Sequence, residues 1–505
     1  MRHRLTLLGS LTALVVASCS LVNRFDPLND VPTDAGGSGG SGGSSGEVSM
    51  GGSAAGEMDM AGMGGTGTAG TMNVAGGTGG GGGAGGSGGA APLPDGLVLV
   101  AGTVGGKVNA NPPGIAVVSV LSPYTGAELA RIKAPAKFEV VAMAYDSVAD
   151  LWYVIYQNAF NPFSEQARLA IVRIGLDGTV VQQSLTQVPV PLSGFLIAPL
   201  RERLLYVAGT GTPPASTFAL IGTKDPKVPV QLSGNNPVAV PMDIDPLTSQ
   251  NPLIGMLARA NTSAGAVGGT VTLITQASYT STFCSNATPP VGTPANACPV
   301  RVLGGTVDAT SKGPSLDAPG AMGYPLVGYV SSISNGAAGW AIEKGNGGGS
   351  DVFFLPPLDF ATDPKAKMVE LSPFSHTVQT SYEFEMKGPH VSNAAFDSCS
   401  GIGFAGELNT ARTLYAVPTA TGGTPSITPI SQTVNLIAFE PFTRTLIRAF
   451  QDQTTPSIDA WSLQGDDKTP TLKPRPATGK NAWGPPADLN PSLIVVKDPP
   501  VPPCN

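Results

Sequence analysis

The chain has 505 residues, only 12% of them Asp, Glu, Lys or Arg, and its formal net charge is −7. Nucleic-acid-binding proteins cluster Lys and Arg on one face, so this composition predicts no nucleic-acid partner. The 66 Gly and 47 Pro indicate many turns together with a low-complexity segment. Runs of β-branched residues without helical periodicity predict an all-β fold for the remainder.

Residues 1–18 have the pattern of a secretory signal peptide. A positive start at Arg2 and Arg4 precedes an apolar run too short to span a bilayer, and small residues then lead to Cys19. A cysteine at this place resembles a bacterial lipoprotein signal, in which Cys19 would become the lipidated first residue. The alternative is an ordinary signal peptide with a chance cysteine. We predict an exported, membrane-anchored lipoprotein, and Ser20 after Cys19 favours the outer membrane by resemblance to known lipoprotein sorting.

Residues 19–95 are predicted to be a disordered tether. From Ala35 to Ala91 the chain is mostly Gly with Ser, Ala and Thr, which bury too little apolar area to offset the entropy of ordering. As a flexible coil this segment would separate its ends by roughly 40 Å. Met58, Met60 and Met63 could offer thioether sulfurs to Cu(I), a soft ion, although methionine is also simply tolerated in a linker.

Residues 96–505 are predicted to form one domain from a repeated four-strand unit. Its inner strand–turn–strand pairs are residues 140–157, 195–208, 394–406 and 436–450, with a fainter copy at 240–256. Outer hairpins are predicted at residues 115–132, 169–184, 217–232, 270–302, 352–371, 414–430 and 458–472. Four short strands per unit, at a period near about 45 residues, are what a β-propeller blade requires. We therefore predict a seven-bladed β-propeller, with six or eight blades as alternatives.

Three segments of these units share an apolar strand, a turn with Asp or Pro and then a Leu-Tyr-Val-like run. They are Trp152 to Val154, Leu204 to Val207 and Leu414 to Val417. This pattern resembles the YVTN and lactonase-like propeller repeats, and the hairpin sequence VVSVLSPYTGAEL matches the second half of such a repeat. The resemblance covers most of residues 97–497 and implies a propeller. These motifs build blades and carry no chemistry, and none of the family's catalytic residues matches a position here.

Ring closure follows from counting strands. The first blade, which begins at Leu97, has one inner strand before its outer hairpin and is therefore one strand short. After the last hairpin, residues 492–497 (SLIVVK) form a strand without a partner in sequence. An unpaired apolar strand invites aggregation. We expect this strand to pair into the first blade and close the ring.

Four cysteines remain after Cys19. An even number in an exported chain indicates disulfides, and their spacing does not fit a zinc site. We predict that Cys284 pairs with Cys298 within one blade and that Cys399 pairs with Cys504, which would pin the C-terminal tail. The alternative is four free thiols.

The face around the channel is the predicted place for ligand contacts. His376 and His390 are the only histidines of the mature chain, which excludes a three-histidine metal centre within it. The predicted face carries Lys137, Glu139, Glu165, Arg259, Glu343, Lys344, Asp351, Lys387, His390, Glu407 and Arg412. The residues selected as possible ligand contacts are His390, Glu139, Lys137, Glu165, Glu343 and Arg412. The alternative interpretation is that these are solvated loop charges.

The three tryptophans of the last two hundred residues are assigned by their surroundings. Trp340 and Trp461 lie in strand-like runs and are predicted to pack between blades, whereas Trp483 lies among Pro and Gly and is predicted to be an exposed aromatic contact.

The predicted function is a surface-tethered, non-enzymatic binding or scaffold propeller of the bacterial cell envelope. Loops on a rigid ring form a recognition surface, and the mature chain is poor in residue types that catalysis recruits. We expect a monomer that contacts the membrane through its lipid and binds an envelope protein or a glycan, without a cofactor. The alternative is a lactonase-like or other hydrolytic propeller enzyme that uses channel-face carboxylates and a divalent cation held in the channel.

Overall fold

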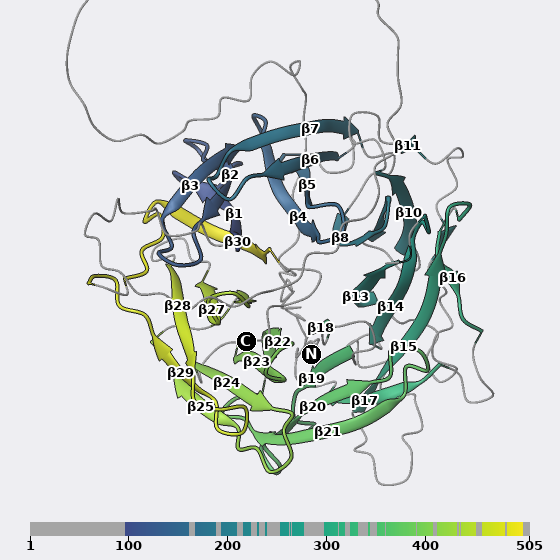
Figure 1. The fold of residues 1–505 in the computed structure, drawn as a ribbon, viewed down its shortest axis with the longest axis vertical. Helices are drawn as coiled ribbons and strands as arrows, with labels where there is room; N and C mark the ends of the chain where they lie inside the picture. The colour runs from purple at the N-terminus through teal and green to yellow at the C-terminus, as the bar shows by residue number, and fades with distance from the viewer. Residues whose placement is uncertain are drawn as a thin grey trace, which may run out of the picture. The chain divides into compact units, whose positions relative to one another are not determined.

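The chain folds into seven antiparallel sheets arranged as the blades of a ring (Figure 1). The computed structural model describes residues 96–160, 167–187, 193–209, 216–223, 230–231, 238–239, 253–261, 263, 265–276, 297–311, 313–318, 324–331, 342–343, 351–358, 360–389, 391–407, 412–431, 434, 436–450, 457–479 and 482–497. Every regular element in these residues is a β-strand. The prediction of an all-β, seven-bladed propeller is therefore confirmed.

Blades are numbered from the one that holds the first strand, and their strands are given from the channel outward. Blade 1 consists of β30 (Leu489–Val496), β1 (Val98–Val104), β2 (Ile115–Leu121) and β3 (Glu128–Lys133). Blade 2 consists of β4 (Phe138–Asp146), β5 (Leu151–Asn158), β6 (Arg168–Ile174) and β7 (Val180–Gln187). Blade 3 consists of β8 (Ser193–Leu200), β9 (Arg203–Gly209) and β10 (Ser216–Gly222) with β11 (Val230–Gln231) and β12 (Val238–Ala239).

The remaining four blades follow in chain order. Blade 4 consists of β13 (Leu253–Ala260), β14 (Gly269–Gln276) and β15 (Ala297–Val307) with β16 (Ser315–Leu316) and β17 (Leu326–Ser331), and blade 5 of β18 (Ile342–Glu343), β19 (Asp351–Leu355), β20 (Lys365–Leu371) and β21 (Val378–Glu385). Blade 6 consists of β22 (Val391–Asp397), β23 (Ile402–Glu407), β24 (Thr413–Pro418) and β25 (Ser426–Pro429). Blade 7 consists of β26 (Leu436–Glu440), β27 (Thr445–Phe450), β28 (Ser457–Gln464) and β29 (Thr471–Pro474).

Apolar residues on both faces of the middle strands form the core between neighbouring blades. β5, for example, is buried along its whole length, and its alternating side chains enter two different apolar clusters, Trp152 and Val154 on one side and Tyr153 and Ile155 on the other. A middle strand with blades on both sides has no solvated face, so its sequence is continuously apolar rather than alternating. This explains why the predicted repeats were visible in the sequence.

A carboxylate ends the inner strand in blades 2, 6 and 7 and caps the turn to the second strand. Asp146 accepts hydrogen bonds from the N–H groups of residues 148 and 149, at 2.9 and 3.0 Å. Asp397 and Glu440 accept from N–H groups two residues further on, at 3.0 and 3.2 Å. All three carboxylates are buried. The acidic residues of the repeated turns are therefore used to order the backbone.

Blades 4 and 5 differ from the predicted strand assignment. The segments taken as outer hairpins, residues 270–302 and 352–371, contain β14 with β15 and β19 with β20, which are the second and third strands of their sheets. The long connection between β14 and β15 hid the true period. In the other five blades the predicted outer hairpins contain the third and fourth strands.

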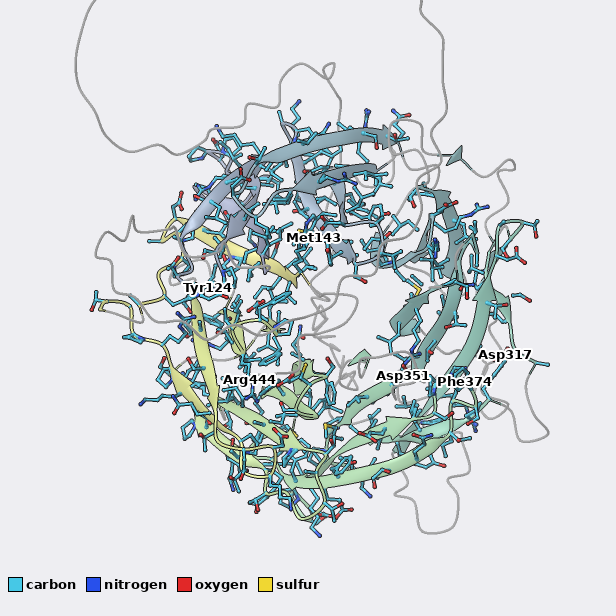
Figure 2. The ribbon with its side chains drawn as sticks, in the orientation of Figure 1. Tyr124, Met143, Asp317, Asp351, Phe374 and Arg444 are labelled. Atoms are coloured by element: carbon cyan, nitrogen blue, oxygen red, sulfur yellow. The ribbon has the colours of Figure 1, made fainter. Side chains whose placement is uncertain are left out.

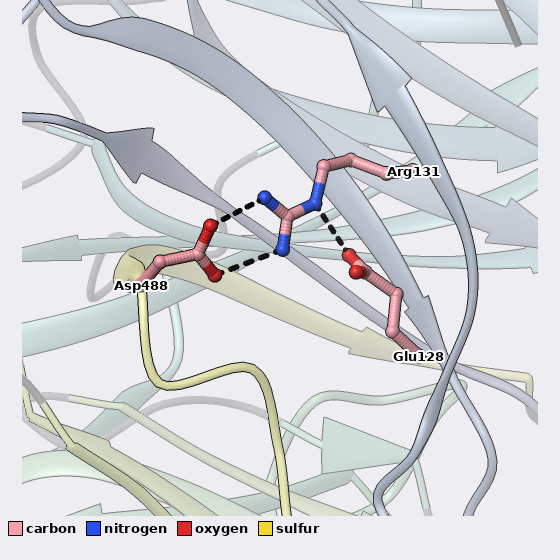
Figure 3. A network of polar contacts seen from close by, with 3 residues as sticks. All are labelled: Glu128, Arg131 and Asp488. Carbon is pink, nitrogen blue, oxygen red and sulfur yellow. Dashed lines mark hydrogen bonds and ion pairs between the residues drawn. The ribbon is translucent and has the colours of Figure 1, made fainter. Parts of the chain in front are cut away.

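The C-terminal strand closes the ring. β30 pairs antiparallel with β1, from Val98 opposite Val496 to Val104 opposite Leu489, and completes blade 1 as predicted. Beside it, the guanidinium of Arg131 donates to both carboxylate oxygens of Asp488 at 2.7 and 2.9 Å and to Glu128 at 2.7 Å (Figure 3). After the strand, the Lys497 ammonium lies 2.9 Å from Asp150 of blade 2. Segments more than 300 residues apart in sequence are thus joined.

Candidate functional site

The ring has two faces that carry different connections. Inner strands begin and second strands end on one face, here called the mouth face. Inner strands end on the other, the turn face, which also carries the turns between third and fourth strands. Figure 2 shows the side chains of the described residues around the ring.

Three of the predicted contact residues lie on the mouth face, two of them on blade 2 and the third on blade 6. Lys137, with a positive φ of 73°, and Glu139 stand at the start of β4 in blade 2. Arg412 precedes β24 in blade 6, and its guanidinium donates to the carbonyl of Ser431 at 3.0 Å. Of the other predicted contacts, His390 and Glu165 lie outside the described residues, as does Lys344.

Glu343 is not on the mouth face. It pairs with Asp351 at the end of β18, where the inner strand joins the second strand, and Arg259 likewise lies near the end of β13. The prediction placed Glu343, Arg259 and Asp351 on the wrong face, because the strands of blades 4 and 5 had been assigned one position too far out.

Glu407 is the most distinctive carboxylate of the described mouth face. It ends β23 and is fully buried. Burial raises the pKa of Glu407, and the nearby hydroxyls of Tyr415 and Thr413 offset this only in part. The Tyr415 hydroxyl accepts the N–H of Lys387 at 2.7 Å. A buried carboxyl group with a raised pKa could hold a proton for transfer.

A second charged cluster joins blades 4 and 5 on the turn face. The guanidinium of Arg259 donates to the buried carboxylate of Asp351, which also accepts the hydroxyl of Thr272 at 3.0 Å. His376 is buried nearby, its Nε2 3.8 Å from an oxygen of Asp317, and burial lowers the pKa of His376. Among the described residues, no group of three or more His, Cys, Asp or Glu side chains could hold a metal ion. The ion pair between Arg259 of β13 and Asp351 of β19 joins blade 4 to blade 5.

Two turns on this face share one local sequence pattern. Residues 122–127 (SPYTGA) of blade 1 and residues 372–377 (SPFSHT) of blade 5 each connect the third strand to the fourth. In both, the first residue's N–H donates to the sixth residue's carbonyl at 2.9 Å, and the fifth residue's N–H donates to the first residue's carbonyl, at 2.8 and 2.9 Å. The fifth residue has a positive φ in each, 69° at Gly126 and 55° at His376.

The aromatic residue at the tip of each turn has a different environment. Tyr124 is 45% exposed in blade 1, whereas Phe374 is 82% exposed in blade 5. The Ser372 hydroxyl accepts the N–H groups of Phe374 and Ser375 at 3.3 and 3.2 Å. The Phe374 ring is thus presented to solvent on a hydrogen-bonded turn. No prediction from the sequence named Phe374, although the hairpin sequence VVSVLSPYTGAEL of blade 1 contains the matching turn.

Of the predictions made for the tryptophans, one is confirmed and one is wrong. Trp461 is buried within the apolar cluster between blades 6 and 7, as predicted. Trp483 is only 3% exposed, so the prediction of an exposed aromatic contact is wrong. It packs between blades 7 and 1 in an apolar cluster with Val117 and Leu121. Trp340 lies outside the described residues.

Cys399 lies in the turn after β22, on the turn face, and its N–H donates to Asp397. The side chains of Cys284, Cys298 and Cys504 lie outside the described residues, as do Cys19, Met58, Met60 and Met63. The predicted disulfide pairing, lipidation and copper binding therefore stay predictions.

Comparisons with known proteins add little beyond the fold. No family model matches the chain, and no curated protein matches it. Solved structures do match. A functionally unknown protein from Desulfotomaculum acetoxidans is 13% identical over 80% of this chain and 99% of its own, with a TM-score of 0.43. A protein from Lactobacillus plantarum is 9% identical over 79% and 98%, with a TM-score of 0.40. The Cps50 (Swd1) β-propeller domain of "Myceliophteria_thermophila" is 10% identical over 70% and 93%, with a TM-score of 0.40.

The residues that the structure describes include no helix with the length and apolar character needed to cross a membrane.

Proposed function

We propose that this chain is a binding or scaffold propeller of the bacterial cell envelope, tethered to the membrane through a lipid on Cys19. The observation that carries the binding function is Phe374, an aromatic ring 82% exposed on a turn that its own hydrogen bonds hold in place. Exposed aromatic residues on rigid supports are typical binding hot spots, because they bury a large area on contact at a low cost in side-chain entropy.

The pairing of charges in the ring supports the same function. Asp146, Asp397 and Glu440 cap turns, and Arg259 with Asp351 joins two blades. Side chains engaged in this way stabilise the ring and keep its surface loops in fixed positions. A rigid ring with an exposed aromatic anchor suits recognition of a partner.

The binding function is tested with the full-length protein immobilised and exposed to solubilised envelope proteins and to purified cell-wall glycans. We expect saturable retention of one of these ligands, weakened at least ~10-fold by Phe374→Ala, as for a hot-spot residue. Phe160→Ala is the matched control, since Phe160 is also exposed but lies in another blade. Retention that Phe374→Ala and Phe160→Ala reduce equally, or no saturable retention, would contradict the proposal.

The tether is tested separately by growing cells with radiolabelled palmitate. The wild-type protein should carry the label and sediment with outer membranes, and Cys19→Ser should lose both properties. A labelled Cys19→Ser variant would refute lipidation at this residue.

A hydrolytic function is the second candidate because of Glu407. Its buried carboxyl group with a raised pKa lies where β23 ends, directly opposite Val391, the residue after His390. The full-length protein would be assayed on lactones and esters with and without calcium. Turnover that Glu407→Gln and His390→Ala abolish would favour the enzyme over the scaffold. Turnover unchanged in both variants would assign it to another residue or to a contaminant.

We propose two disulfides, Cys284 with Cys298 and Cys399 with Cys504. The position of Cys399 supports the second, because β30 runs toward the turn face and would deliver Cys504 there. Seven residues separate Val496 from residue 504 and can span up to about 24 Å when extended. Peptide mapping without reduction should recover both pairs, and a fragment joining Cys284 to Cys504 would overturn this assignment.

A further inference from the structure

The turn of blade 1 is covered by a segment from the other end of the chain. Residues 475–479 and 482–484, here called the strap, follow β29 of blade 7 and contact the turn at residues 122–127. The strap supplies donors to three successive carbonyl oxygens of the turn. Arg475 donates to Pro123 at 3.2 Å and to Tyr124, and the N–H of Gly484 donates to Thr125 at 2.8 Å.

Trp483 completes this cover. Its indole N–H donates to the carbonyl of Pro123 at 3.3 Å, and its ring lies directly over Gly126. A Cβ atom added at Gly126 would be 2.6 Å from the indole ring, so the glycine leaves the space that the tryptophan fills. The blade 1 turn is thus an occupied docking site, and the structure shows which chemistry it accepts: a guanidinium, an indole and a backbone N–H.

The blade 5 turn has the same backbone hydrogen bonds, but none of the residues that the structure describes covers it as the strap covers the blade 1 turn. Within the described part of the chain, the carbonyl oxygens of Pro373, Phe374 and Ser375 accept no hydrogen bond. In place of the tryptophan, His376 fills the neighbouring space with its own side chain, which packs against Gly304 and lies near Asp317 of blade 4. The side of the turn is therefore closed while its carbonyl edge and the Phe374 ring remain open.

The charge beside this edge favours a cationic ligand. The Asp317 side chain is 57% exposed and lies 3.8 Å from His376, and Figure 2 labels Asp317 beside Phe374 at the edge of the ring. Burial lowers the pKa of His376, so the histidine adds no positive charge at neutral pH that would oppose a cation. A guanidinium can donate to adjacent carbonyls and stack on an aromatic ring at once, which a lysine ammonium cannot do.

We propose that the blade 5 turn, residues 372–377, is a docking site for an arginine-bearing segment of a partner protein. The arginine donates to the carbonyl oxygens of Pro373 and Phe374, as Arg475 does to Pro123 and Tyr124, and its guanidinium stacks on the Phe374 ring. Asp317 attracts the incoming charge. This inference rests on the proposed binding function and names the class of partner.

The test uses a probe taken from this chain, an acetylated and amidated peptide with the sequence of residues 475–484. The full-length protein carries 4-fluorophenylalanine at position 374, and a second preparation carries it at position 124 as the matched control. Fluorine NMR follows each label during titration with the peptide and with its Arg475→Lys form. We expect a saturable shift at position 374 only, with affinity lowered ~10-fold for the lysine peptide.

Asp317→Asn should weaken binding of the arginine peptide about threefold, with a smaller effect of salt on the remaining affinity. Equal affinity for the arginine and lysine peptides, equal shifts at positions 124 and 374, or no saturable shift up to ~5 mM peptide would overturn the inference. The failure of the inference and that of the proposed function are distinguishable. An envelope ligand whose retention needs Phe374 but which does not compete with the peptide would preserve the binding function and remove the arginine-bearing partner.

Discussion

The turns of blades 1 and 5 have nearly the same sequence pattern and backbone hydrogen bonds but opposite surroundings. In blade 1 the strap covers the turn and ties the last blade to the first. In blade 5 the same backbone stands open and exposes an aromatic ring. The two turns also differ at the fifth position, which is Gly126 in blade 1 and His376 in blade 5. The comparison teaches that one local motif can be covered by a distant segment in one blade and expose an aromatic ring in another.

The largest expected effect comes from removing the residue that fills the covered turn. Trp483→Ala should lower the free energy of unfolding by ~3–5 kcal/mol, because a buried indole is lost from between blades 7 and 1 and a cavity remains. Urea unfolding followed by near-UV circular dichroism measures this. Phe374→Ala is the control from the open turn and should change stability by less than ~0.5 kcal/mol. Similar losses in the two variants would mean that the two turns do not differ as described.

Gly126→His places the blade 5 residue in blade 1 and should lower stability by ~2–4 kcal/mol. The new side chain would occupy the position of the Trp483 ring and force the strap away. In the double variant with Trp483→Ala, the combined loss should be clearly smaller than the sum, since both changes disrupt one contact. Strict additivity in urea unfolding would show that the histidine does not displace the tryptophan.

The ion pair beside the closing strand should contribute less. Arg131→Ala should lower stability by ~0.5–1 kcal/mol at low salt and by less at 1 M salt, because the Asp488 side chain is 51% exposed. Hydrogen bonding to Arg131 lowers the pKa of Asp488. The contribution of Asp488 to the free energy of unfolding is therefore complete above about pH 4, the pKa of Asp in the unfolded chain. It is lost as the pH falls through the lower pKa of the folded protein.

Asp488→Asn is the matched variant for this ion pair. It should remove the part of the unfolding free energy that the wild type loses when Asp488 is protonated, while leaving the fold at neutral pH intact. A pH dependence identical in the wild type and Asp488→Asn would contradict the role of this pair.

The smallest expected effect is a pH dependence of stability at the fifth position of the blade 5 turn, where His376 can bind a proton and Gly126 of blade 1 cannot. Burial lowers the pKa of His376, so the unfolded chain binds a proton there more readily than the folded chain. The contribution of His376 to the free energy of unfolding is complete above about pH 6.5, the pKa of His in the unfolded chain. It is lost as the pH falls from there through the lower pKa of the folded protein. His376→Gln should therefore lose less stability than the wild type between pH 7 and pH 5 in urea unfolding. Parallel pH profiles would exclude this contribution of His376.

Most of the blade architecture was predictable because its signals are local. Strand patterns such as residues 140–157 and the turn residues between them depend on neighbours in sequence, and the unpaired strand at 492–497 indicated the closing strand. The prediction failed in blades 4 and 5, where a long connection interrupts the repeat. That single shift moved Glu343, Arg259 and Asp351 to the wrong face, since the direction of each strand decides where its ends lie.

The sequence by itself determined the strand pairs, the turn chemistry and the need for a closing strand, because periodicity and backbone preference act over a few residues. Only the tertiary structure decided which turn is covered. Trp483, which its Pro and Gly neighbours suggested would be exposed, is buried because Pro123, 360 positions earlier, lies against it. Phe374, in a turn of the same pattern, is exposed, and no segment among the described residues covers it. Exposure depends on what packs against a residue from far along the chain, and local sequence does not encode that contact.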